Sequence, residues 1–226
     1  MRVENVNQNA SLRALVAFTR MGLGLFAVVA IVRQLGIQIR LGFSVLNFFS
    51  YFTNLANMLA AGVLILGAGR TLVGSRTTLL CEGVRAASVV YMAVVGMVFG
   101  VLLRDVDLGS LLPWVNFVLH VLMPCAVVVD WLVMPPQRVF GNRDLLVWQI
   151  FPLLYLAYVL LRGSQVGWYP YPFLNPDAVG GYSNVVAYII GIAAVFMLVG
   201  WALAVLGNRR RKKAQWFART RTRWFP

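Results

Sequence analysis

The chain has 226 residues, of which 60% are hydrophobic and 12% charged, and its formal net charge at pH 7 is +13. A soluble domain is roughly 45–50% apolar, so this composition and a mean hydropathy of +0.77 favour an integral membrane protein without a separate soluble domain. Eight of the 20 basic residues lie between Arg209 and Arg223, directly after an apolar block. That position is typical of a tail that binds anionic lipid head groups, and it argues against nucleic-acid binding.

Six apolar blocks are long enough to cross a bilayer, which takes about 20 residues per helix. Blocks of this length do not match the alternating strands of about ten residues that build a membrane β-barrel. We therefore expect an all-α membrane protein, with residues 1–11 as its N-terminus, residues 12–206 as its transmembrane domain and residues 207–226 as its basic tail. The predicted helices are Leu12–Gln34, Val45–Leu66, Leu79–Leu103, Leu111–Met134, Leu145–Leu161 and Ser183–Leu206.

Basic residues are unevenly divided between the two ends of these helices. If the six blocks alternate in direction, fifteen basic residues fall on the side of the termini and four on the opposite side. The positive-inside rule then places both termini in the cytoplasm, for a multi-pass protein of the cell membrane.

The second block opens with a polar cluster in the stretch NFFSYFTNLAN, which runs from Asn47 to Asn57. Polar side chains are rare in membrane-spanning helices and often mark function. In one continuous helix Thr53 and Asn57, four residues apart, share a face, and Thr53 lies about eight residues, roughly 12 Å, from the outer end.

The fourth block carries His120 at a matching depth, about nine residues or 13–14 Å from its outer end. Pro124, four residues later, leaves the His120 carbonyl without a helical donor and predicts a kink beside the histidine. Asn116, four residues before His120, shares its face. We therefore expect Thr53 and His120 to meet.

Threonine and histidine together support acyl transfer, because an imidazole can accept the hydroxyl proton and so activate the nucleophile. Amide side chains are candidate donors to the oxyanion, and three tyrosines in the outer halves of the last two helices are candidate substrate-binding partners. These residues are Asn54, Asn57, Asn116, Tyr155, Tyr158 and Tyr188.

The alternative to catalysis is that these polar residues serve only to pack the helices together. In that case Thr53 bonds back to the Phe49 carbonyl, His120 only joins two helices, and the tyrosines are interfacial aromatics. His120 is the only histidine, which argues against a histidine metal site or a bis-histidine haem, so we expect no cofactor and no metal.

Charged residues also occur near the predicted inner ends of the helices. Because charges in a membrane are paired or face water, we expect an ion-pair network of Arg20, Asp130, Glu82 and Arg85, with Arg20–Asp130 as its main pair. The alternative to this structural role is proton-coupled transport.

One long connection, Arg162–Tyr182, interleaves aromatic residues with three prolines. Prolines prevent a regular helix, and aromatic residues suit the membrane–water interface. The segment is either an interfacial anchor or a cap over a cavity between helix ends.

Three stretches, FFSYFTNLAN, NFVLHVLMP followed by VVVDW, and GWYPYPFLNP, resemble the androgen-induced-protein family of multi-pass membrane proteins, and more closely its bacterial six-helix branch. Animal members of that family are threonine hydrolases that cleave esters of fatty acids with hydroxy fatty acids, using one threonine and one histidine. The resemblance places these roles on Thr53 and His120, with a membrane lipid or fatty-acid ester as substrate. A small transporter or channel and a non-catalytic membrane scaffold are the alternatives.

Overall fold

The structure, a computed structural model, describes the backbone of residues 2–75, 77–106 and 109–224, and the side chains between residues 11 and 213 within these ranges. Helix makes up 84% of it, and the described residues contain no strand. Six helical stretches are long and apolar enough to cross a membrane, which confirms the all-α architecture. They are Ser11–Arg40, Phe52–Val73, Leu79–Leu103, Pro113–Val133, Asn142–Val166 and Tyr182–Lys213.

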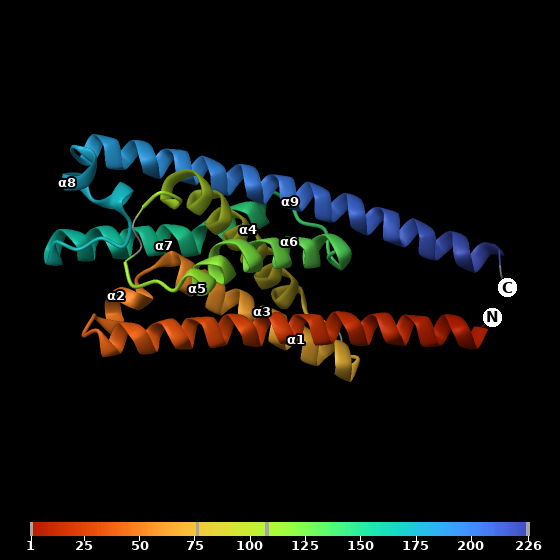
Figure 1. The fold of residues 1–226 in the computed structure, drawn as a ribbon. Coiled ribbons are helices and arrows are strands. Elements are labelled where there is room, and N and C mark those ends of the chain that lie inside the picture. Colours follow the sequence, from red (N-terminus) through yellow and green to blue (C-terminus); the bar gives the residue numbers. More distant parts are fainter. Residues whose placement is uncertain (1, 76, 107–108, 225–226) are drawn as a thin grey trace.

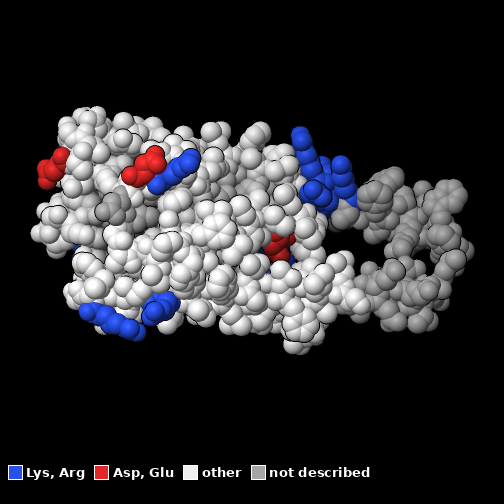
Figure 2. All heavy atoms as spheres, in the orientation of Figure 1, with Lys and Arg blue, Asp and Glu red and all other residues white. Residues whose placement is uncertain are grey.

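Two long helices, α1 (Arg2–Arg40) and α9 (Tyr182–Trp224), lie on opposite sides of the bundle, with the shorter helices between them (Figure 1). The start of α1 and the end of α9 lie at the same end of the molecule. The helical backbone continues through most of residues 1–11 and 207–226, which the sequence analysis set apart. On the face drawn in Figure 2 most atoms are uncharged, and Lys and Arg side chains gather on the described part of α9 near that end.

The second predicted helix is divided into α2 (Val45–Phe49) and α3 (Phe52–Val73). Between them Tyr51 has an extended backbone (φ −79°, ψ 125°). A phenol from α7 (Asn142–Val166) bridges the break: the Tyr155 hydroxyl accepts the Phe52 N–H at 3.2 Å and donates to the Ser50 carbonyl at 2.9 Å. Irregular backbone at membrane depth is tolerated where protein groups satisfy it, so Tyr155 stabilises this break.

Two π-helical turns lie in neighbouring helices. The turn η1 (Phe99–Leu103) follows α4 (Leu79–Val98), and η2 (Val118–Leu122) lies between α5 (Pro113–Phe117) and α6 (Met123–Val133). The predicted kink near Pro124 takes the form of η2. The helices pack closely here, because a Cβ on Gly96 would lie 3.1 Å from Pro124 Cβ. π-turns are rare in proteins, and those that occur often lie at functional sites.

The loop between α7 and α9 contains the 3₁₀ turn η3 (Pro172–Leu174) and the short helix α8 (Pro176–Val179). It folds back over the bundle, so two of its aromatic residues and a leucine become part of the core: Tyr171, Phe173 and Leu174 are all buried. Beneath it, an aromatic cluster centred on Phe52 joins three further helices.

Candidate active site

Thr53 lies in the first turn of α3, directly after the backbone break. Its side chain is buried, and its Oγ1 is 3.4 Å from the hydroxyl of Tyr171, which also accepts the Thr53 N–H at 3.2 Å. It makes no hydrogen bond to the Phe49 carbonyl. The first N–H groups of a helix lack helical acceptors, and the helix dipole favours negative charge there. Here two of these groups, the N–H of Phe52 and the N–H of Thr53, donate to the hydroxyls of Tyr155 and Tyr171.

His120 lies in the turn η2, and its ring stacks on Phe99 of η1 with centroids 4.2 Å apart. Its Nδ1 is 3.2 Å from the backbone oxygen of Asn116. Since a carbonyl oxygen only accepts hydrogen bonds, Nδ1 carries the proton, and Nε2 of a neutral ring is left as the acceptor. The Asn116 carbonyl thus fixes the orientation of the imidazole ring.

Thr53 and His120 line the same cavity, which has a volume of about 410 Å³. No direct hydrogen bond joins them among the described residues; the cavity lies between them. Its other polar lining groups come from α1, the break before α3, α3 itself and the loop before α9. They are Gln34, Gln38, Tyr51, Asn54, Tyr169, Tyr171 and Asn175.

Asn57 joins the helix that carries Thr53 to the turn that carries His120. Its Nδ2 donates to the Thr53 carbonyl at 2.9 Å and to the Leu119 carbonyl at 3.1 Å, and the residue is fully buried. Leu119 precedes His120, so α3 and η2 are neighbours at the level where the sequence analysis expected contact. Because both protons of this amide are used, Asn57 joins the helices and has no free donor for a substrate.

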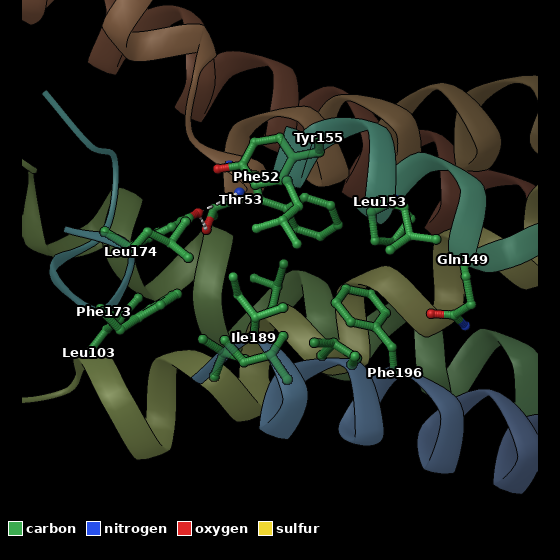
Figure 3. Close-up of a pocket in the computed structure, with 18 residues that line it drawn as sticks. Phe52, Thr53, Leu103, Gln149, Leu153, Tyr155, Phe173, Leu174, Ile189 and Phe196 are labelled. Carbon is green, nitrogen blue, oxygen red and sulfur yellow. Dashed lines mark hydrogen bonds between the residues drawn. The ribbon is translucent and has the colours of Figure 1, made fainter. Parts of the chain in front are cut away.

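A second cavity, of about 120 Å³, lies on the other side of Thr53 (Figure 3). Thr53 lies near one end of it and Gln149 near the other, with apolar side chains between them. Leu153 of α7 lines this cavity and is 58% exposed, so the cavity reaches the surface of the bundle between α7 and α9. Thr53 and Tyr171 line both cavities.

The loop before α9 is a cap, the second of the two interpretations that the sequence allowed. Tyr169, Tyr171 and Asn175 close the polar cavity. Tyr169 packs directly on Gly163 of α7, where any Cβ would collide with its ring. Burial raises the pKa of the Tyr171 hydroxyl above its ordinary value, so this group stays a neutral hydrogen-bond donor.

The sequence analysis did not single out Tyr171. The one indication in the sequence was the loop that contains Tyr171, a long connection dense in proline and aromatic residues, which is a composition that suits a cap over a cavity. Nothing in the spacing indicated which aromatic residue would reach Thr53, since the two are 118 positions apart.

The other predicted site residues are dispersed. The Asn54 side chain lines the polar cavity but donates to the Phe48 carbonyl at 2.7 Å. Asn116 contributes its backbone, while its side-chain oxygen is buried without a partner. Tyr155 lines the apolar cavity. Two tyrosines lie outside both cavities: the hydroxyl of Tyr158 pairs with Ser50 at 2.9 Å, and Tyr188 lines a groove beside α4.

The charged residues form a separate group near the other end of the bundle. Arg20 holds Asp130 with two bonds, of 2.6 and 3.0 Å, and Arg85 reaches the same carboxylate at 3.0 Å. Glu82 makes no ion pair with a described side chain; it accepts the backbone N–H of Gln137 at 3.0 Å. One carboxylate therefore serves two arginines.

The described residues contain no group of three or more His, Cys, Asp or Glu placed to hold a metal ion. No protein-family model matches the chain, and no curated protein or solved structure matches it either. The chemistry of the site is therefore inferred from the geometry of this chain alone.

Proposed function

We propose that the protein hydrolyses lipid esters inside the membrane, with Thr53 as nucleophile and His120 as general base. The observation that carries this proposal is the position of Thr53 on the wall between two cavities. The apolar cavity opens toward lipid and suits an acyl chain, while the polar cavity contains His120 and suits water and the leaving alcohol.

In the first step Thr53 Oγ1 attacks the ester carbonyl carbon, and its proton passes to His120 Nε2. A water molecule in the polar cavity relays this proton, because the two side chains are not in direct contact. The tetrahedral intermediate then expels the alcohol, which takes the proton from His120, and leaves an acyl ester on Thr53. Water activated by His120 cleaves that ester, releases the fatty acid and restores the threonine.

The Tyr171 hydroxyl is the donor best placed for the developing oxyanion. It already lies within 3.4 Å of Thr53 Oγ1, and the N-terminus of α3 adds a favourable dipole. Among the amides predicted from sequence, Asn57 uses both of its protons within the bundle and Asn116 does not line the cavity. Asn54 lines the cavity and donates one of its two protons to the Phe48 carbonyl, so it remains a second candidate donor.

A fatty-acid ester is the substrate class that fits these cavities, and it agrees with the resemblance to the androgen-induced-protein family. The lateral opening between α7 and α9 supports entry of the substrate from the bilayer, with its acyl chain passing the exposed Leu153. Lipid esters that never leave the membrane thus reach Thr53 without crossing water.

The test uses the full chain in lipid nanodiscs, a fluorophosphonate probe and a fatty-acid p-nitrophenyl ester. We expect the probe to label the wild type and Thr53→Ser, and not Thr53→Ala. His120→Ala lowers the hydrolysis rate by about 10²–10⁴-fold, the usual contribution of a general base. Thr19→Ala, which changes an exposed threonine of α1, is the matched control and retains full activity. Equal labelling of wild type and Thr53→Ala overturns the proposal.

The orientation belongs to the same proposal: both termini face the cytoplasm, so that the cavities lie in the outer half of the cell membrane. The excess of basic residues at the end that holds the termini supports it. Single cysteines introduced at position 40 and position 213, in a variant that lacks Cys81 and Cys125, test it in intact cells. A membrane-impermeant maleimide labels the first and not the second if the orientation is right.

A further inference from the structure

A third cavity, of about 500 Å³, lies far from Thr53, between the N-terminal half of α1, the end of α3 and the start of α4. Four arginines line it: Arg13, Arg20, Arg70 and Arg85. Such a concentration of guanidinium groups is uncommon in a bundle whose other surfaces are largely apolar, and it requires anions for balance.

The carboxylates of the protein neutralise only part of this positive charge. Asp130 pairs with Arg20 and Arg85, and Glu82 is the one acidic residue among those that line the cavity. Arg13 and Arg70 make no ion pair with any described carboxylate. Four positive charges against two negative ones leave an excess of two, which the single negative charge of a phospholipid phosphate offsets in part.

Hydrogen-bonding capacity is also left over. The Nε of Arg85 is buried and has no partner among the described residues. Hydroxyl groups of Thr71, Ser75 and Thr77 line the same space. Guanidinium N–H groups and hydroxyls together are the donors that phosphate oxygens accept.

The rim of the cavity points to a ligand that also has an apolar part. Leu66, Leu80 and Val84 line it and are 62%, 76% and 37% exposed, respectively. An inorganic anion gains nothing from contact with these apolar side chains, whereas the acyl chains of a phospholipid would cover them. The segments that line the cavity, the end of α3 and the start of α4, lie toward the end of the bundle that holds both termini (Figure 1), where we expect the head groups of one leaflet.

We propose that this cavity binds the phosphate of an anionic phospholipid, with Arg13 and Arg70, which pair with no described carboxylate, as its cations and the exposed leucines against its chains. The site is independent of the Thr53 chemistry, and the tail side chains that the structure describes, residues 207–213, do not line it. It ties the inner ends of α1, α3 and α4 to one lipid molecule.

The experiment is native mass spectrometry of the full chain in detergent with phosphatidylglycerol, phosphatidylcholine or inorganic phosphate added. We expect one phosphatidylglycerol to stay bound at about 1 M salt, where the Debye length is about 3 Å, because direct guanidinium–phosphate hydrogen bonds resist screening better than the longer-range attraction of the tail. Arg13→Gln and Arg70→Gln each weaken that binding by about tenfold or more, as expected for a lost charge-assisted bond. Arg40→Gln, the same change on an exposed arginine at the opposite end of α1, leaves it unchanged.

Equal affinity for phosphatidylcholine overturns the proposal, and so does unchanged binding in the Arg13→Gln, Arg70→Gln double variant. Displacement of the lipid by millimolar inorganic phosphate also overturns it, because the site then takes the free anion. Thermal unfolding of each variant in the same detergent, with a midpoint matching the wild type in the absence of lipid, shows that the fold is intact.

Discussion

Replacing Tyr171 with phenylalanine removes one hydroxyl oxygen and leaves the buried ring in place. The ring keeps its contacts with Tyr51 and Phe173. The Thr53 N–H loses its acceptor at 3.2 Å, and a buried group without a partner costs about 1–3 kcal/mol. We therefore expect Tyr171→Phe to fold, with a thermal midpoint a few degrees below that of the wild type.

The effect on catalysis is larger than the effect on folding. If the Tyr171 hydroxyl donates to the oxyanion, its loss lowers kcat by about 10²–10³-fold, or about 2.7–4 kcal/mol, as for other oxyanion donors. We expect KM to change little, because the Tyr171 ring stays in the lining of the apolar cavity and only its hydroxyl is lost. The loss therefore falls on kcat, which separates a role in the transition state from a role in binding.

The assay is steady-state hydrolysis of a fatty-acid p-nitrophenyl ester in nanodiscs, with kcat and KM measured separately. Tyr158→Phe is the matched control, since that hydroxyl pairs with Ser50 and lies outside both cavities. A Tyr171→Phe protein with wild-type kcat, measured beside an inactive Thr53→Ala protein, would refute the role of Tyr171.

Two further predictions concern stability. Asp130→Asn leaves Arg20 and Arg85 without their shared carboxylate, and loss of one partner of a buried pair costs about 3–5 kcal/mol; a drop in the thermal midpoint measures it, and an unchanged midpoint contradicts it. Gly163→Ala places a methyl group inside the Tyr169 ring, so the cap must move. We expect faster proteolysis within residues 167–181, and identical cleavage kinetics in wild type and variant would exclude this packing role.

The cavities also bear on the transporter alternative. The polar cavity at Thr53 and the arginine-lined cavity share no lining residue. Between them lie the apolar middle sections of α3 and α4, where alanine, valine and leucine are buried against each other. A conducting path needs continuous polar groups, and the two cavities do not supply it in the described chain, so two independent sites fit the arrangement better.

The number and type of the spanning helices follow from sequence alone. Each apolar block is long enough to cross a bilayer, and in hydrocarbon a helix is the one way for a single segment to satisfy its own backbone. The polarity of Thr53 and the loop rich in proline and aromatic residues were also visible, because both are local anomalies in composition. Local chemistry was enough for these features.

The break in the second helix could not be predicted from the sequence, and it determines where Thr53 lies in the candidate site. Sequence predicted one helix over Val45–Leu66, because Ser50 and Tyr51 do not forbid helix. The break persists since groups distant in sequence satisfy its backbone: Tyr155 bonds Ser50 and Phe52, and Tyr171 bonds Thr53. Those contacts exist only after α7 and the following loop have packed, so only the tertiary structure places Thr53 at a helix N-terminus between two cavities.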